Sequence, residues 1–200
     1  MEDQFAAMIA YVQSAFRESG SHGFDHVLRV TLLCERLGAD EQADMRILLP
    51  AALFHDIGRP AEEATGIPHE EEGARIAERY LRSVRYDDAR IPAIVHAIRT
   101  HRFRSAAIPE TPEARILSDA DKLDAMGAVG IARTFMQAGE RGGDMTDAAG
   151  HITEKLLLLR DRLYTASARR MAQERHAVLV AFLAALTDEL AVPPPPRAPP

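Results

Sequence analysis

Apolar residues recur at three- and four-residue spacings along almost the whole chain, and this pattern constrains the fold more than any other feature. Near the N-terminus, for example, Phe5, Met8 and Val12 fall on one side of a helix. No segment shows an alternation of apolar and polar residues long enough to predict a strand. We therefore expect an all-α protein, a globular helical bundle rather than a coiled coil.

Capping and helix-breaking residues divide this pattern into separate helices. Asp40 suits the N-cap of the third helix, and Pro50 within that helix predicts a kink. The segments RPAEEATGIP (59–68) and GERGGDMTDAAG (139–150) are predicted as loops because of their proline and glycine content. The expected helices cover residues 3–17, 24–37, 40–56, 69–81, 87–101, 111–124, 125–138, 152–164 and 168–190.

The length and composition predict one folded domain with a short tail. The chain has 200 residues, of which 46% are hydrophobic, so it can bury a substantial core. Residues 1–191 are expected to form this single domain. Residues 192–200 contain the run PPPPRAPP and are expected to form a proline-rich, disordered tail.

Charge and cysteine content narrow the class of protein. The net charge of -6 argues against a protein that grips nucleic-acid backbones. Cys34 is the only cysteine, so no intrachain disulfide can form, which fits a reducing cytoplasm. No apolar run reaches the roughly 18 to 20 residues of a membrane span, and the N-terminus lacks the layout of a signal peptide. We expect a cytoplasmic protein that does not bind membranes.

An adjacent histidine and aspartate stand at the end of an apolar stretch. His55 and Asp56 lie in the run AALFHDIGRP, where Gly58 and Pro60 end the helix. Burying an imidazole and a carboxylate there is costly unless both groups are used. Their side chains can converge on one ion beyond the helix end. The alternative is that Asp56 pairs with an arginine such as Arg59.

Upstream, two histidines form a second group of candidate ligands. His22 and His26 are four residues apart, the spacing at which two histidines on one helical face share a metal. Glycines flank His22, however, so it is expected just before the helix. We favour His26 as a ligand and His22 as a neighbour that contacts water or substrate.

Downstream, three aspartates lie in the mostly apolar run ILSDADKLDAMG. Only one or two of these carboxylates can face the same ion, and we choose Asp121 as the ligand. Asp124 is expected to orient a coordinated water or a histidine ligand, and Asp119 either does the same or is solvated. Nitrogen and oxygen donors from three separated segments indicate one divalent metal with open coordination positions.

The set His26, His55-Asp56 and Asp121 resembles the HD superfamily of metal-dependent phosphohydrolases. Small bacterial HD proteins that include nucleoside triphosphate pyrophosphohydrolases are similar in the runs SHGFDHVLRV, AALFHDIGRP, IVHAIRTHRF, ILSDADKLDAMGAVGIARTF and ARRMAQERHAVLVAFL. The resemblance spans roughly residues 5–190 and implies an HD-type helical domain. The four-ligand signature is specific for the superfamily but weak evidence for any one substrate.

The ligand set implies a metal cofactor and its chemistry. Two imidazoles and two carboxylates suit manganese, magnesium, iron, nickel or zinc, with manganese or magnesium favoured for activity. Such an ion lowers the pKa of its bound water and neutralises charge that develops on a phosphoryl group. We expect catalytic roles for Asp56, Asp121 and Asp124, with Asp121, Asp124 or a histidine accepting the proton.

The resemblance further implies hydrolysis of a phosphate ester or anhydride in a small-molecule nucleotide. Cleavage of a (deoxy)nucleoside triphosphate to monophosphate and pyrophosphate ranks first. A 5′-nucleotidase, a phosphodiesterase, a nucleotide-sensing protein with little turnover and a two-iron oxygenase are the alternatives. The apolar character of the last helix permits a homodimer.

Several other side chains are expected to contact substrate. Arg59 and Lys122 are the basic residues that we favour as phosphate contacts. HD proteins with two metals resemble this chain in having histidines between the His-Asp pair and the last aspartate. His96 and His101 lie in that interval, but their spacing sets them about 140° apart on a helix, so both cannot easily face one site. One of them is expected to bind a second metal or a phosphate, or to shuttle protons.

A further histidine opens the next expected helix. His69 precedes Glu70, Glu71 and Glu72, and this acidic run is a favourable charge pattern for a helix N-terminus. In the alternative, Glu70 or Glu71 contacts the water on the metal. The sequence assigns no ligand role to His69 itself.

Overall fold

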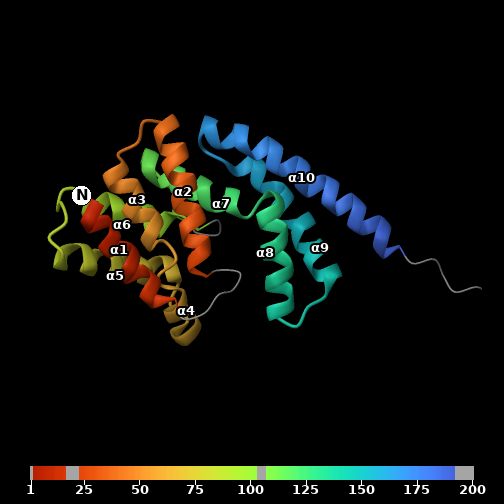
Figure 1. The fold of residues 1–200 in the computed structure, drawn as a ribbon, viewed down its shortest axis with the longest axis horizontal. Helices are drawn as coiled ribbons and strands as arrows, with labels where there is room; N and C mark the ends of the chain where they lie inside the picture. The colour runs from red at the N-terminus through yellow and green to blue at the C-terminus, as the bar shows by residue number, and fades with distance from the viewer. Residues whose placement is uncertain (1, 17–22, 103–106, 192–200) are drawn as a thin grey trace, which may run out of the picture.

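The structure, a computed structural model, describes residues 2–16, 23–102 and 107–191 (Figure 1). The expected all-α fold is confirmed, and these ranges contain no strand. The predicted proline-rich tail and His22 lie outside the described residues. The helices are α1 (Glu2–Ala15), α2 (Phe24–Asp40), α3 (Met45–Phe54), α4 (Arg59–Thr65), α5 (His69–Ser83), α6 (Ile91–Thr100), α7 (Pro112–Asp124), α8 (Gly127–Glu140), α9 (Met145–Glu154), the 3₁₀ helix η1 (Leu156–Arg162) and α10 (Ala166–Leu190).

Helix α3 forms the centre of the N-terminal half, which we define as α1–α7. It packs against α1, α2, α5, α6 and α7. Its last residues, Leu53 and Phe54, are fully buried, and the ring of Phe54 packs against Tyr11 and Tyr80. A helix that is covered on nearly every side requires the almost unbroken apolar run seen in its sequence.

The start of α3 differs from the expected position. Helix α2 continues to Asp40, and the N-cap of α3 is Asp44, whose carboxylate accepts a hydrogen bond from the backbone N–H of Arg46. The prediction of Asp40 as the N-cap was therefore wrong. Both residues have the side chain that an N-cap requires, so the sequence pattern alone does not choose between them.

Residues 59–65 form a helix where a loop was expected. Pro60 occupies the first turn of α4, where its missing N–H is not needed and its fixed φ favours the helix. Gly66 ends α4 with φ of 75°, in the left-handed region. These two residues mark the two ends of a short helix, not the interior of a loop.

The 139–150 segment also contains helix where a loop was expected. Helix α9 begins at Met145, and Asp144 and Asp147 form a capping box at its N-terminus. The expected helix over 152–164 is divided, because α9 ends at Glu154 and η1 follows as a 3₁₀ helix.

Helices α8, α9, η1 and α10 pack together as the C-terminal half of the molecule. In Figure 1, α10 runs along the top of this half and α8 lies beside α9. Buried Asp119 of α7 accepts hydrogen bonds from the backbone N–H groups of Tyr164 and Thr165 at 2.9 and 2.8 Å, and so joins the start of α10 to the N-terminal half. Among the described residues, no helix has the length and apolar character needed to span a membrane.

Candidate metal centre

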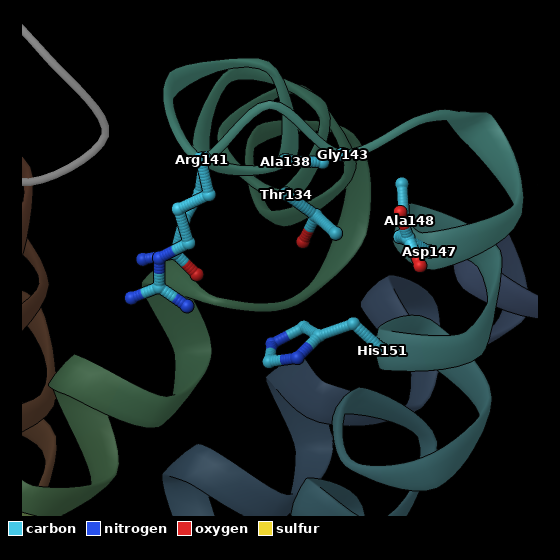
Figure 2. A pocket seen from close by; sticks show the side chains of 8 residues that line it. Thr134, Ala138, Arg141, Gly143, Asp147, Ala148 and His151 are labelled. Carbon is cyan, nitrogen blue, oxygen red and sulfur yellow. The ribbon is translucent and has the colours of Figure 1, made fainter.

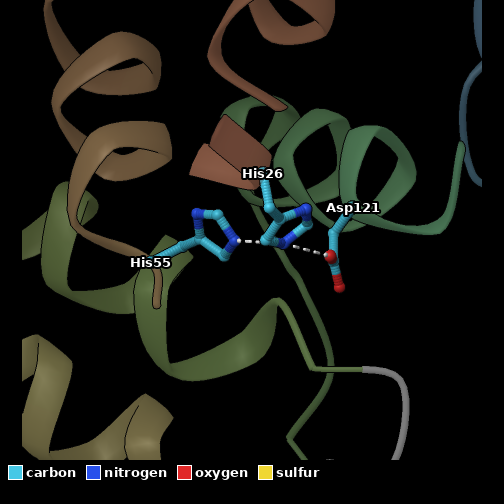
Figure 3. A group of neighbouring side chains, drawn as sticks. All are labelled: His26, His55 and Asp121. Atoms are coloured by element: carbon cyan, nitrogen blue, oxygen red, sulfur yellow. Dashed lines mark hydrogen bonds and ion pairs between the residues drawn. The ribbon is translucent and has the colours of Figure 1, made fainter. Parts of the chain in front are cut away.

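The four predicted ligands meet at one point in the N-terminal half. His26 lies in the first turn of α2, His55 and Asp56 directly follow α3, and Asp121 lies in the last turn of α7. The Nε2 atoms of His26 and His55 are 3.2 Å apart. His26 Nε2 also lies 3.4 Å from both Asp56 Oδ2 and Asp121 Oδ1. Figure 3 shows His55 and Asp121 on opposite sides of His26.

These separations are those expected of atoms that bind one ion. Donors held at about 2.0–2.2 Å from a divalent cation lie roughly 3.0–3.5 Å from one another. His26, His55 and Asp121 each present one ligand atom, and these three atoms lie within 4.8 Å of one another. His26, His55 and Asp56 are completely buried, whereas 25% of the Asp121 side chain is exposed. The centre therefore opens to solvent on the side of Asp121.

The hydrogen bonds on the far side of each ring indicate which nitrogen carries a lone pair. His55 Nδ1 donates to the backbone oxygen of Ala52 at 2.7 Å, and His26 Nδ1 lies 2.7 Å from Asp124 Oδ2. These partners assign the ring proton to Nδ1, so both Nε2 atoms present lone pairs. Two lone pairs at 3.2 Å repel each other unless a proton or a metal cation lies between them. The chemistry of the donor set thus fits a cation.

Two more histidines face the other oxygen of Asp56. His69 Nε2 lies 3.3 Å and His101 Nε2 lies 3.7 Å from Asp56 Oδ1. Their Nδ1 atoms are held by Glu62 Oε2 at 2.7 Å and by the backbone oxygen of Ile98 at 2.6 Å. Within the described parts of the chain, the buried Asp56 Oδ1 and His69 Nε2 have no hydrogen-bond partner. Buried polar atoms of this kind indicate a missing ligand.

The electrostatics of the centre follow from burial and from the paired charges. Burial raises the pKa of Asp56, but Arg59 and the surrounding histidines outweigh it and hold this pKa well below its usual range. Burial lowers the pKa of His55 to about 4, so this ring is neutral at pH 7. Burial also lowers the pKa of His26, but hydrogen bonds with three carboxylates, beginning with Asp121, raise it to about 10. The carboxylates that favour a proton on His26 equally favour a cation in its place.

Asp124 holds the ring of His26 from behind. Its carboxylate accepts from His26 Nδ1, from Arg29 Nε at 2.8 Å and from Arg133 Nη1 at 2.7 Å. Burial raises the pKa of Asp124, but hydrogen bonds from His26 and Arg29 lower it to about 2. A carboxylate on the second ring nitrogen fixes both the tautomer and the orientation of a histidine ligand.

A close approach of two backbones brings His69 to this centre. A Cβ atom at Gly58 would lie 2.3 Å from the backbone oxygen of His69 and 2.7 Å from the backbone nitrogen of Gly73. Only glycine therefore allows the turn after His55 and Asp56 to lie against the first turns of α5. This contact positions His69 beside Asp56.

The other predicted site residues fall at different places. Arg59 lies at the edge of the centre, and its Nε donates to Asp56 Oδ2 at 2.5 Å. The Lys122 ammonium is buried and donates to Ser118 Oγ at 2.6 Å. His96 Nε2 accepts from the backbone N–H of Glu110. His101, but not His96, thus faces the metal centre.

Sequence analysis assigned no role to two residues that complete the centre. His69 lies beside Asp56, and Glu62 from the unexpected helix α4 holds its Nδ1. A signal for His69 was present, because its spacing to Gly73, Ala77 and Leu81 places it on the buried face of α5. Glu62 gave no comparable signal, since its role depends on α4 being helical.

Comparison with known proteins identifies the family. The profile of the HD domain matches residues 23–126, the part that holds all of the candidate ligands discussed above. The chain belongs to the HD domain family. YpgQ of Bacillus subtilis is 36% identical over 192 residues, covering 90% of each protein.

Solved structures agree with this assignment. The crystal structure of B. subtilis YpgQ in complex with ADP superposes with a TM-score of 0.78 at 32% identity, covering 94% of this chain and 98% of that one. A predicted HD superfamily hydrolase from an uncultured Thermotogales bacterium gives a TM-score of 0.72 at 31% identity, covering 92% and 91%. Ribonuclease Y of Chloroflexus aurantiacus is 36% identical over 104 residues, 52% of this chain but only 18% of that protein.

Proposed function

We propose that this HD domain protein is a metal-dependent phosphohydrolase that cleaves a nucleoside triphosphate to a monophosphate and pyrophosphate. The observation that carries the proposal is the convergence of the His26 and His55 lone pairs with the carboxylates of Asp56 and Asp121. The similarity to YpgQ, which was crystallised with ADP, supports a nucleotide as the substrate class.

We assign the first cation to His26, His55, Asp56 and Asp121. This mixture of nitrogen and oxygen donors suits several divalent ions, and the carboxylates favour manganese or magnesium during turnover. When bound, such a cation acidifies water and neutralises charge on the phosphoryl group. Because Asp121 is the partly exposed ligand, we place the substrate phosphate on its side of the centre.

The protein's own side chains have three further roles in this proposal. Asp121 accepts the proton from the water that attacks phosphorus, because its carboxylate is the one that solvent reaches. Arg59, 26% exposed beside Asp56, contacts a phosphate oxygen. Asp124 keeps the His26 ring oriented without touching the substrate.

We also assign a second cation position to the other side of Asp56. The donors there are Asp56 Oδ1, His69 Nε2 and His101 Nε2, and two of these three atoms lack a hydrogen-bond partner among the described residues. Asp56 would then supply a carboxylate oxygen to each position, and two bound cations would stabilise charge on the oxygens of a phosphoryl group. Metal content measured after His69→Ala, with His176→Ala of α10 as the control, tests this assignment: one ion fewer per chain supports it, and an unchanged count contradicts it.

The test of the function is a phosphate-release assay with and without added inorganic pyrophosphatase, across nucleoside mono-, di- and triphosphates with manganese or magnesium. We expect release from triphosphates only when pyrophosphatase is present. His55→Ala and Asp56→Ala should abolish the activity, and His176→Ala should retain it. Full activity in either ligand variant would disprove the proposal, and phosphate release without pyrophosphatase would indicate a nucleotidase.

A phosphodiesterase is the second candidate, favoured by the match to ribonuclease Y over the HD part of the chain. Cleavage of bis(p-nitrophenyl) phosphate and of a short RNA should distinguish it from the first proposal. We expect the triphosphate reaction to be the faster one.

A further inference from the structure

A groove lies between α8 and α9, and all of its lining residues except Ala125 lie beyond the segment that matches the HD domain. It comprises two adjoining hollows of about 260 and 90 Å³, both lined by Thr134, Gln137 and His151. Figure 2 shows Arg141, from just beyond α8, and His151, from α9, reaching toward the space between the helices. No residue of the proposed metal centre lines either hollow.

The charged side chains that line this groove are mostly basic. Arg141 and Lys155 contribute positive charges, and Arg133, which also pairs with Asp124, contributes a third. Asp147 is the one carboxylate among the described residues that line the two hollows. Its Oδ2 already accepts the backbone N–H of Asp144 in the capping box of α9. The groove therefore favours an anion.

The size of the groove limits what that anion can be. Pockets that enclose drug-sized ligands measure roughly 300–1,000 Å³, and the two hollows together, at about 350 Å³, lie at the lower end of this range. Arginine and lysine, together with the side-chain amide of Gln137 that lines both hollows, suit the oxygens of phosphate groups. A chain of two or three phosphates fits these dimensions better than a whole nucleotide.

Arg133 connects the groove to the metal centre. Its Nη1 donates to Asp124 Oδ2 at 2.7 Å, and the same carboxylate holds His26 Nδ1. One guanidinium thus lines the groove and contacts the residue that orients a proposed ligand.

We propose that the α8–α9 groove is an oligophosphate-binding site, which takes inorganic di- or triphosphate or the phosphate chain of a nucleotide. Arg141 and Lys155 bind phosphate oxygens, and Arg133 connects this binding to the His26 side of the centre. The binding of a free phosphate chain does not depend on the proposed nucleotide hydrolysis. The binding of a nucleotide substrate through its phosphate chain rests on that proposed function.

The first arm of the experiment measures binding without catalysis. Inorganic triphosphate is titrated calorimetrically into the full-length protein in the presence of EDTA, which removes any contribution from bound divalent metal. The variant Arg141→Gln/Lys155→Gln should bind at least about tenfold more weakly than the wild type. Arg75→Gln removes an exposed arginine of α5 that pairs with Glu72, and it should bind like the wild type. Equal binding by the double variant and the wild type, with both folded by circular dichroism, would overturn the proposal.

The second arm of the experiment distinguishes a free phosphate chain from the phosphate chain of a nucleotide substrate. If the groove receives the substrate, the double variant should raise the KM for a nucleoside triphosphate at least about fivefold with little change in kcat. If binding of inorganic triphosphate falls but KM is unchanged, the site serves free phosphate chains instead. His55→Ala separates the two proposals, because it should abolish hydrolysis and still bind triphosphate in EDTA. Loss of that binding in His55→Ala but not in the double variant would place the anion at the metal centre and disprove the groove site.

Discussion

The N-terminal and C-terminal halves of the molecule differ in how many ionisable side chains they bury. The N-terminal half buries four histidines, together with Asp56, Asp119, Lys122 and Asp124, almost completely. Among the described residues of the C-terminal half, the buried polar side chains are the hydroxyls of Thr134 and Ser167. Thr134 bonds to the backbone of its own helix and Ser167 bonds to Glu41, so neither is left without a partner.

This difference agrees with the proposed place of the reaction, because the N-terminal half accepts the energetic cost of burying ionisable groups. A buried charge is costly unless it is paired or binds a metal, and the N-terminal half accumulates such groups at the ends of α3 and α7. In the C-terminal half, Arg133, Arg141 and Lys155 line a groove, and none of them is fully buried. We interpret the first half as the site of the reaction and the second as a site of recognition.

The largest expected effect comes from the residue that both cation positions share. Asp56→Asn removes negative charge from between four histidines, so both positions lose affinity for the metal. Hydrolysis should fall at least about a thousandfold, equivalent to about 4 kcal/mol in the barrier. Measuring kcat/KM together with the metal content checks this, and normal metal content with normal activity would contradict it.

The next effect compares the packing of the two halves. Phe54→Ala removes a fully buried ring from the centre of the N-terminal half and should lower the free energy of unfolding by about 3–5 kcal/mol. Leu158→Ala in η1, where the side chain is 50% exposed, should change it by less than about 0.5 kcal/mol. Urea denaturation of both variants measures this, and equal losses would contradict the larger contribution expected of the buried ring.

A smaller effect is expected at the link between the halves. Asp124→Asn weakens the support of the His26 ring and should reduce metal affinity about 10- to 100-fold. Metal titration, with the exposed Asp88→Asn as the control, checks this. An Asp124→Asn affinity equal to that of the wild type would mean that packing alone orients the ring.

The carboxylate of Asp124 also makes the stability of the folded protein depend on pH. The pKa of Asp124 is lowered to about 2 in the folded protein from 3.8, so its contribution to stability is complete above pH 4 and is lost as the pH falls toward 2. Asp124→Asn should remove this part of the acid destabilisation, and Asp88→Asn should not. Acid unfolding followed by circular dichroism compares the two curves, which should separate between about pH 4 and pH 2.

The smallest effect is expected at the start of α9. Asp144→Ala removes one side chain of the capping box and should cost about 1 kcal/mol of unfolding free energy. Asp161→Ala, which changes a 71% exposed carboxylate, should cost less than about 0.5 kcal/mol. Thermal denaturation measures both, and a loss for Asp144→Ala no larger than that for Asp161→Ala would show that the cap does not stabilise this half.

Sequence reasoning predicted the parts of the structure that depend on local pattern. The helical class followed from the spacing of apolar residues, and the four donors His26, His55, Asp56 and Asp121 were selected from their residue types and separate segments. It was wrong about 59–65 and 145–150, where the prolines and glycines that suggested loops accompany short capped helices. The same residue types occur at helix ends and in loops, so local composition does not separate the two.

The sequence by itself determined the helical class and the kinds of atoms available to hold a cation. Both depend only on the identity of the residues and their spacing along the chain. Only the tertiary structure decided that His69 faces Asp56 and that Asp124 reaches both His26 and Arg133. These contacts depend on the close approach of separate helices, such as the one that Gly58 permits. The spacing of residues along the chain does not report the distance between helices that pack together, and so it could not reveal them.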